Sequence, residues 1–454
     1  MPLKRSGETR KAEIRERNTI FCRVIWIAPS DEGVAGIFME LLGKSKDELR
    51  EMSAAMGEPA YRGGQIYHAL YAERKFALAG MTNLPAALRA RLAAEATIAL
   101  PVVKQRFESS DGSVRYLFEL GAVEKPGINA EIAEDTEVTE KIGGGGRGRA
   151  LKAASVEAVF MPSEGRQTIC VSTQAGCAVD CQFCLTARLG LIRNLTAGEI
   201  LGQVLVALEE DRRGREARSD AKAGEEDAGL KPGATQAVPQ TVAGITQRDP
   251  IQTNVVLMGQ GEPLLNFEAV MAALRILLDP EGVGISAKHV TLSTSGIVPG
   301  IERLGLEKAR PKLAISLNAS NDEQRDALMP INKKYPLSVL LDACRKYPLR
   351  PWEHLTFEYV MLGGVNDAGE DARRVVRLLA PLKSVKVNLI PWNPGELPYR
   401  ESSAEAIEEF RRILVDRGIP AFVRYSRGRD VMAACGQLAL MQIENAQPSA
   451  ASIG

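Results

Sequence analysis

From about residue 168 onward, short runs rich in β-branched and aromatic residues alternate with amphipathic segments such as AEAIEEFRRIL. This alternation predicts parallel βα units, and therefore an α/β fold. In closed or partly closed parallel barrels, functional residues gather at the C-terminal ends of the strands. The runs that we predict as strands are TICVST, NVVLMG, HVTLSTSG, KLAISLN, LTFEYVML, VKVNLIPW and AFVRYSR.

The stretch CAVDCQFC follows the first of these strands and places Cys177, Cys181 and Cys184 at C-x3-C-x2-C spacing. The next segment, NLTAGEILGQVLVALEE, opens with Thr196 and Glu199, which form the pattern of a capping box at a helix start. The three cysteines are therefore predicted in a loop between a strand and a helix, at the end of the sheet where sites form.

Three closely spaced thiols favour an iron–sulfur cluster over zinc. Structural zinc sites usually have four protein ligands, often as two C-x2-C pairs, and no second pair or histidine lies near this loop. A four-iron cube held by three cysteines leaves one iron free for a small molecule. This spacing, with Phe183 before the last cysteine, resembles radical S-adenosylmethionine (SAM) enzymes. A zinc knuckle or a chance cluster is the alternative.

The overall composition excludes few classes of protein. The 454 residues contain 57 basic and 57 acidic side chains, so the chain is not a strongly basic nucleic-acid binder, although local basic patches remain possible. There is no apolar run of transmembrane length and no signal-peptide pattern, so no membrane association is expected. We therefore expect a cytoplasmic protein with reduced thiols, and the odd cysteine count of seven argues against a fully paired disulfide framework.

Five segments are expected along the chain. Ser45 and Glu48 form a capping-box pattern and Gly57 a helix stop, whereas Asp111-Gly112 between alternating runs predicts a hairpin. The segments are a disordered extension (1–38), a helical accessory domain (39–105), a β-hairpin linker region (106–165), the barrel (166–400) with a disordered, charged insertion (209–250), and a C-terminal segment (401–454).

Longer motifs narrow the class of enzyme. VEAVFMPSEGRQTICVSTQAGCAVDCQFC, LMGQGEPLLN, LAISLNASNDEQRDALMPINKKYPL and VRYSRGRDVMAACGQL resemble the RlmN/Cfr family of radical SAM RNA adenine methyltransferases, over about residues 40–445. The RlmN branch is the most similar. This resemblance implies a partial parallel (β/α) radical-SAM barrel with a small N-terminal helical domain that binds RNA.

The resemblance also implies an activity and its cofactors. The expected reaction methylates C2 of an adenosine in 23S rRNA, and also an adenosine next to the anticodon of tRNA. It would use a [4Fe-4S] cluster, two SAM molecules per turnover and an electron donor such as flavodoxin. The alternatives are a Cfr-like enzyme acting on C8, a radical SAM enzyme with another substrate, and a zinc-stabilised RNA-binding protein without catalysis.

By the same resemblance, three residues have catalytic roles. Cys435 in AACGQL matches the thiol that carries the methyl group into a covalent adduct with RNA, and Cys170 matches the thiol that resolves this adduct through a disulfide with Cys435. Glu157 matches the residue that moves the proton from C2. Without the resemblance, Cys170 reads as a buried strand residue, Cys435 as a core residue of a helical stretch, and Glu157 as a solvated strand residue. Cys22 and Cys344 are left as structural.

SAM contacts and RNA contacts complete the predicted site. Asn318 stands in SLNA where the family has SLHA, and asparagine cannot transfer a proton near neutral pH as histidine can. A second departure is GQGEP in place of the usual GMGEP. The alternative for the basic residues that could bind RNA is that they form an ordinary solvated surface. The target base must leave its stack before the enzyme can reach it. The SAM-contact positions are Gly261, Glu262, Ser293, Ser316, Asn318 and Asn393, and the RNA candidates are Lys333, Lys334, Arg424, Arg427 and Arg429.

Overall fold

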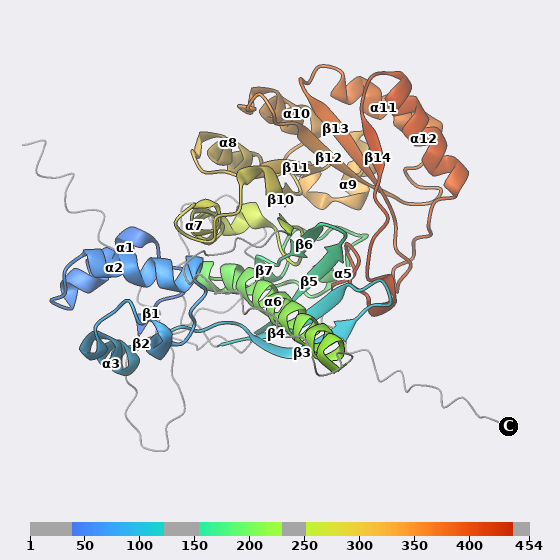
Figure 1. Cartoon of the computed structure of the whole chain (residues 1–454). Helices are drawn as coiled ribbons and strands as arrows, with labels where there is room; N and C mark the ends of the chain where they lie inside the picture. The colour runs from blue at the N-terminus through green and yellow to red at the C-terminus, as the bar shows by residue number, and fades with distance from the viewer. Residues whose placement is uncertain (1–38, 122–153, 229–250, 439–454) are drawn as a thin grey trace, which may run out of the picture.

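The computed structural model describes residues 39–121, 154–228 and 251–438. Its centre is one ten-stranded mixed sheet in the order β14-β13-β12-β11-β10-β9-β6-β5-β4-β3 (Figure 1). The expected extension (1–38), Cys22 and residues 229–250 of the expected insertion lie outside the described residues.

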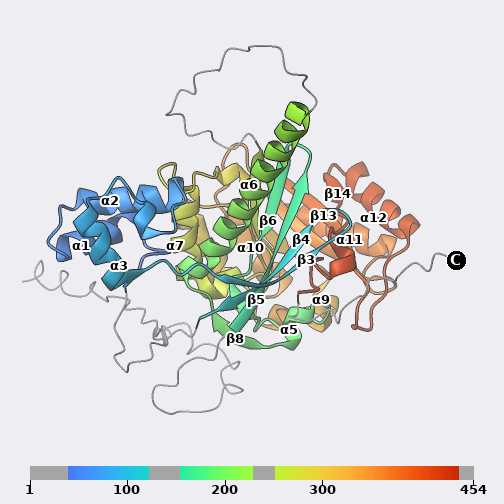
Figure 2. The same cartoon turned by 60° about the horizontal axis from the view of Figure 1, so that its bottom comes forward.

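The seven predicted strands are confirmed, and neighbours among them pair in parallel. Helices between these strands cover one face of the sheet, as Figures 1 and 2 show, so the α/β partial barrel is confirmed. The strands are β6 (Arg166–Cys170), β9 (Gln252–Leu257), β10 (Val290–Thr294), β11 (Lys312–Ser316), β12 (Leu355–Met361), β13 (Val385–Pro391) and β14 (Ala421–Val423).

The covering helices bury their apolar faces against the strands. Tyr359 of β12, for example, packs its ring 5.0 Å from that of Phe410. The long helices are α6 (Ala197–Ala228), α7 (Phe267–Leu278), α8 (Val298–Leu306), α10 (Leu337–Lys346), α11 (Gly369–Leu379) and α12 (Ala404–Asp416). Shorter turns are α5 (Leu185–Arg188), α9 (Asp322–Leu328), η2 (Leu78–Gly80), η4 (Pro263–Asn266), η5 (Ala287–His289), η6 (Pro330–Lys333) and η7 (Arg429–Val431).

Strands β3 (Val102–Glu108), β4 (Val114–Leu120) and β5 (Ala154–Ser163) extend the sheet in antiparallel order. The predicted hairpin at Asp111-Gly112 is confirmed, because β3 and β4 pair across it. The region expected as a β-hairpin linker, 106–165, contains β4 and β5. β4 is buried along almost its whole length and bonds to strands on both sides, so it belongs to the central sheet.

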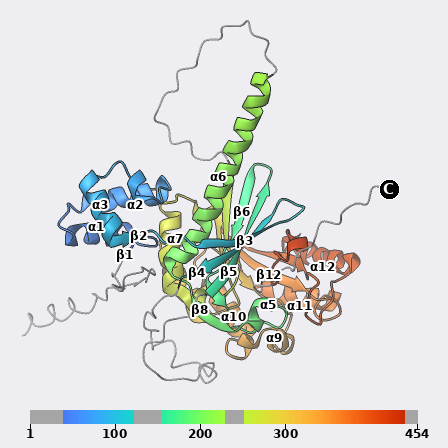
Figure 3. The ribbon, with the colours of Figure 1, turned by 90° about the horizontal axis from the view of Figure 1, so that it is seen from below.

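The N-terminal module is mostly helical and lies beside α7 (Figure 3). The capping box of Ser45 and Glu48 is confirmed, and Tyr67 joins the module to the barrel by donating a 2.8 Å hydrogen bond to Asp279. Its elements are β1 (Met39–Glu40), α1 (Lys46–Ala55), α2 (Tyr61–Tyr67), the π-helical turn η1 (His68–Ala72), α3 (Ala86–Glu95) and β2 (Ala96–Thr97).

Helix α6 corrects the expectation that residues 209–250 are disordered, because its helix continues to Ala228. Its charges lie three and four residues apart, which places opposite charges together on the helix surface. Arg212 pairs with both Glu209 and Glu216 at 2.7 Å and 2.5 Å. The charged residues that suggested disorder therefore form ion pairs that stabilise a solvated helix.

Candidate functional site

The three cysteines lie in the loop after β6, between the short paired strands β7 (Gln174–Gly176) and β8 (Leu191–Asn194). Gly176 has φ of +73°, and a Cβ there would come within 1.8 Å of the Gly190 carbonyl oxygen. This close approach lets the Cys177 amide donate to Gly190 at 3.0 Å. Farther along the loop, the Cys184 amide donates to Cys181 at 3.1 Å, and α5 begins at the next residue.

The donor set fits an iron–sulfur cluster. Burial raises the pKa of the Cys177 thiol to about 12, and burial followed by the charges of Cys184 and Cys177 raises the pKa of Cys181. The three thiols are thus close enough to disfavour one another's ionisation, and a bound cation would favour the thiolate forms. Among the described residues, no group of three or more histidine, cysteine or acidic side chains converges to hold a single metal ion.

The segment that carries Cys435 packs directly on this loop. The amide of Leu185 donates to the Gly436 carbonyl at 2.8 Å, and the Thr186 hydroxyl donates to the Leu438 carbonyl at 2.6 Å. The expectation of a helix around Cys435 is wrong, because the residue lies in a turn after η7. Cys435 keeps exposed surface, yet burial, followed by the charges of Glu358 and Cys184, raises its thiol pKa to about 11.

Cys170 at the end of β6 is buried in a small apolar cluster that includes Val159, Val431 and Leu438. The cluster joins two strands to the C-terminal segment. Burial, and then the charge of Cys435, raises the pKa of Cys170, so the two thiols lie within electrostatic reach of each other. All six described cysteines are free thiols, and a disulfide between Cys170 and Cys435 is not a feature of this structure.

Glu157 on β5 is buried and paired, so its alternative interpretation as a solvated residue is wrong. Arg115 on β4 is fully buried and donates from Nη1 to Glu157 Oε1, and Gln260 Nε2 lies 3.4 Å from Glu157 Oε2. Arg115 also lies over the Phe107 ring at 4.1 Å. A buried carboxylate needs such partners to stay charged. Arg115 was missed because the sequence places it 42 residues from Glu157.

The hairpin turn between β3 and β4 anchors the C-terminal segment. Ser109 Oγ donates to Asp430 at 2.5 Å, and the Ser110 amide donates to the same carboxylate at 2.9 Å. In return, Arg427 pairs with Asp111 at 3.3 Å. The turn thus holds residues 427–430, a few residues before Cys435.

The GQGEP loop lies against the cysteine loop. Gly261 has φ of +94°, and a Cβ there would meet Gln174 at 2.5 Å, so glycine is required. The buried Glu262 carboxylate accepts 2.7 Å bonds from the amide and hydroxyl of Ser295, and a 3.0 Å bond from the Leu264 amide. Burial raises the pKa of Glu262 while these hydrogen bonds lower it. Ser295 is a second residue that sequence reasoning missed.

Ser293 on β10 and Ser316 on β11 lie at the C-terminal ends of neighbouring strands, and Ser316 is two residues beyond Ala314, the partner of Ser293. Asn393 follows β13 and donates to Ser426 at 2.9 Å. The fully buried Arg325 was missed; it donates to the carbonyls of Ser295 and Ser316 at 2.7 and 3.1 Å. Burial lowers the Arg325 pKa to about 10, and the nearby Cys181 charge opposes this shift.

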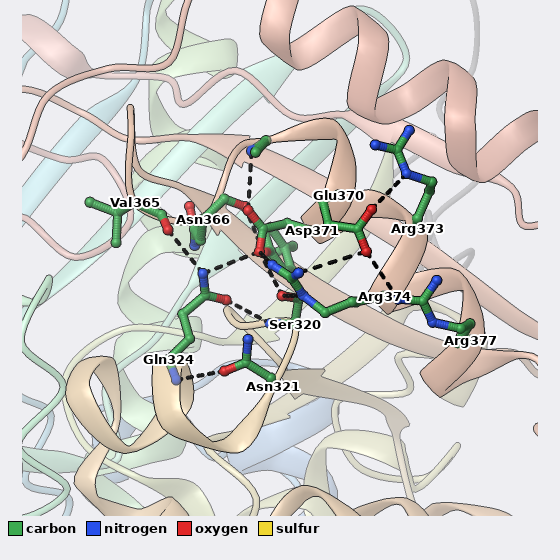
Figure 4. Close-up of polar contacts among 12 residues, drawn as sticks. Ser320, Asn321, Gln324, Val365, Asn366, Glu370, Asp371, Arg373, Arg374 and Arg377 are labelled. Atoms are coloured by element: carbon green, nitrogen blue, oxygen red, sulfur yellow. Dashed lines mark hydrogen bonds and ion pairs between the residues drawn. The ribbon is translucent and has the colours of Figure 1, made fainter.

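Asn318 adopts a left-handed conformation with φ of +53°, which asparagine tolerates better than most residues. Its Oδ1 accepts from the Val360 amide at 2.8 Å, and its carbonyl accepts from Asn366 at 2.9 Å. Figure 4 shows the polar network behind this loop, in which Asp371 of α11 accepts from Ser320 at 2.6 Å. The Asn318 side chain thus fixes the backbone after β11.

Of the cations predicted to meet RNA, Arg427 and Arg429 are ion-paired within the protein, Arg429 with Glu401 at 3.2 Å. Arg424 is exposed, and its Nε lies 3.3 Å from Asn388 Oδ1. Lys333 and Lys334 are exposed at the end of η6. The ion pairs give Arg427 and Arg429 a structural role.

The fold and the cysteine loop define a radical SAM protein, and the Radical SAM superfamily matches residues 237–379. The Ribosomal RNA large subunit methyltransferase N-terminal domain matches residues 39–98. A crystal structure of a radical SAM methyltransferase from Sphaerobacter thermophilus aligns with a TM-score of 0.69 at 39% identity, covering 88% of this chain and 99% of that one.

Two curated relatives have closely similar sequences. The probable dual-specificity RNA methyltransferase RlmN of Koribacter versatilis (strain Ellin345) is 45% identical over 385 residues, which are 84% of this chain and 96% of the relative. The dual-specificity RNA methyltransferase RlmN of Anaeromyxobacter sp. (strain Fw109-5) is 42% identical over 395 residues, 87% of this chain and 88% of the relative. The chain belongs to the RlmN family of radical SAM RNA methyltransferases.

Family membership confirms the resemblance seen in the sequence. The superfamily implies an iron–sulfur cluster and SAM as cofactors, and the substrate is RNA. Over residues 39–121, 154–228 and 251–438, the structure contains no helix with the length and apolar character of a membrane span.

Proposed function

We propose that this enzyme methylates C2 of an adenosine in 23S rRNA and of an adenosine next to the tRNA anticodon. Cys435 is the methyl carrier, and Cys177, Cys181 and Cys184 hold the cluster. The observation that carries this proposal is the docking of the Cys435 turn on α5 by the Leu185–Gly436 and Thr186–Leu438 hydrogen bonds. This docking supports the proposal because it holds the turn of Cys435 against the segment that follows the three cysteines.

C2 of adenine is electron-poor, so it does not attack a sulfonium methyl group directly. When bound, the cluster supplies the electron that splits SAM into methionine and a carbon radical. The chain supplies the Cys435 thiol, which a first SAM methylates, so two SAM molecules serve each turnover. The carbon radical would remove one hydrogen atom from the S-methyl group, and the resulting S-methylene carbon, still attached to Cys435 sulfur, adds to C2 to give a protein–RNA adduct.

Glu157 and Cys170 complete the cycle. Glu157, held by its ion pair with Arg115, accepts the proton that leaves C2. Cys170 then attacks Cys435 sulfur, which forms a transient disulfide and releases the methylated RNA. An electron donor such as flavodoxin supplies the electrons, and the N-terminal module of residues 39–105 holds the RNA.

The test is anaerobic reconstitution of the enzyme with SAM, a reductant, and either 23S rRNA or tRNA, followed by identification of the methyladenosine isomer by mass spectrometry. We expect 2-methyladenosine in both RNAs. The 8-methyl isomer would replace the proposal with the Cfr-like alternative, and no methylated RNA would reject it. Cys435→Ala should abolish methylation, Cys170→Ala should trap the adduct, and Cys344→Ala is the control.

A further inference from the structure

The inner face of β12 and β13 carries the polar pairs Thr356–Lys386 and Glu358–Asn388, although the outer face is apolar. On β12, Phe357 and Tyr359 are buried in the main core, while the alternate residue Glu358 points to the opposite face. Parallel sheets usually bury both faces and read as continuous apolar runs. A polar inner face therefore indicates a surface that meets something other than the protein core.

The register between β13 and β14 places an aromatic ring on this inner face. Val387 pairs with Ala421, and both are buried in the core, so the next pair, Asn388 and Phe422, points to the inner face. Phe422 is 46% exposed on a strand at the edge of the sheet. The Arg424 guanidinium lies over its ring, 5.5 Å from the centroid.

Two positive charges flank this ring. Lys386 lies two residues before Asn388 and so shares its face, and it makes no salt bridge with any other described residue. Arg424 makes a single polar side-chain contact in the described structure, to Asn388 Oδ1 at 3.3 Å. Burial, and then the charge of Arg424, lowers the pKa of Lys386, whereas the charge of Glu358 raises it, so the two cations and Glu358 interact electrostatically.

The same patch adjoins the candidate active site. Asn388 Nδ2 donates to Glu358 Oε1 at 2.9 Å, and Glu358 pairs in register with Ser316, one of the predicted SAM contacts. The charge of Glu358 also contributes to the raised pKa of Cys435. A ligand on the patch therefore lies next to the methyl-carrying thiol.

We propose that Lys386, Phe422 and Arg424, with the Glu358–Asn388 pair, form a binding subsite for the nucleotide that flanks the target adenosine. The base stacks on the Phe422 ring, the cations hold its phosphate, and the carboxylate and amide contact its polar edge. An exposed ring beside cations is the combination that binds unstacked RNA. This inference rests on the proposed function, because that function supplies the RNA.

The test measures binding of the reconstituted enzyme to a short single-stranded RNA with a central adenosine, by fluorescence anisotropy at several salt concentrations. Phe422→Ala should weaken binding roughly 5- to 150-fold, the loss expected for one stacked base. Lys386→Gln should reduce the slope of log K against log salt by about 0.7, the loss of one phosphate contact on a single strand.

Matched controls are Lys383→Gln, an exposed lysine just before β13, and Val415→Ala, an exposed apolar residue on α12. Both should bind as the wild type does, and iron content checks that every variant is folded. The same measurement is repeated with RNAs that lack the nucleotide on the 5′ or the 3′ side. On one of these two RNAs the Phe422→Ala defect should disappear.

Unchanged binding of Phe422→Ala and Lys386→Gln would overturn the subsite. An equal Phe422→Ala defect on both shortened RNAs would also overturn it, because the ring would then serve no particular neighbour of the target. If the wild type still forms methyladenosine in either case, the proposed function is retained and only the subsite is rejected. A wild-type enzyme that binds no RNA would remove both.

Discussion

The amide of Leu185, which follows Cys184, donates a 2.8 Å hydrogen bond to the carbonyl of Gly436, which follows Cys435. The two residues are 251 positions apart in the chain. One hydrogen bond thus joins the proposed cluster loop to the proposed methyl carrier, and the bond from the next residue, Thr186, to Leu438 adds a second connection.

Replacing Thr186 by Val tests this connection, because it keeps the shape of the side chain and removes the donor to Leu438. A buried hydrogen bond of this kind contributes about 1 kcal/mol, and an unsatisfied carbonyl adds to the cost. Residues 431–438 should therefore exchange amide hydrogens faster, and methyl transfer should fall. Thr82→Val, at an exposed position, is the control. Unchanged exchange in the C-terminal segment would contradict the prediction.

The cluster assignment predicts the metal content of single variants. Cys177→Ala, Cys181→Ala and Cys184→Ala should each lose the brown colour of the anaerobically purified protein and most of its iron, because three thiolates hold the cube. Cys344→Ala should keep about four irons per chain, since Cys344 is buried in the core on α10. Zinc in place of iron in the wild type would argue for the RNA-binding alternative without catalysis.

Arg115 should be essential for stability as long as Glu157 is present. Arg115→Met leaves a buried carboxylate without its cation and should lower the free energy of unfolding by about 3–5 kcal/mol, measured by urea denaturation. The double variant Arg115→Met/Glu157→Leu should recover most of this loss. Arg106→Met, which breaks an exposed ion pair with Glu108 on the same hairpin, should cost less than about 1 kcal/mol. If the effects of Arg115→Met and of Glu157→Leu, measured singly, add up to the effect of the double variant, the two residues are not coupled.

The titration of Lys386 has a predicted direction. Burial and the charge of Arg424 both disfavour the ammonium form, so the pKa lies below the ordinary value of 10.5. Since the unfolded chain then binds more protons between the two pKa values, stability rises with pH in that window. Arg424→Gln should move the pKa upward, as followed by NMR of ¹³C-methylated lysines, and Arg417→Gln should not. A Lys386 signal indifferent to Arg424 would refute the electrostatic coupling.

The sequence predicted the parts of this fold that depend on local patterns. Seven strands followed from alternating β-rich runs, and the capping boxes at Ser45 and Thr196 mark the true starts of α1 and α6. The cysteine loop was found because its spacing is local. The sheet position of β4 was missed, because a hairpin pattern does not reveal which strand pairs with its second edge.

The missed site residues depend on long-range contacts. Arg115 meets Glu157 across two strands, and Ser295 meets Glu262 from the neighbouring strand end. Arg325 bonds to the carbonyls of two strands, which no side-chain spacing encodes. The helical reading of Cys435 failed because VMAACGQL contains helix-forming residues but folds as a turn held from outside, by α5 and the hairpin.

The hydrogen bond between Ser109 and Asp430 limits how related chains can exchange segments. Two segments separated by more than 300 positions must match each other to hold Cys435, the proposed methyl carrier, in place. A chimera that takes the hairpin from one relative and the last strand and tail from another should fold around its own sheet and yet misplace that thiol. We therefore expect exchange between relatives to keep activity only when both segments are transferred together.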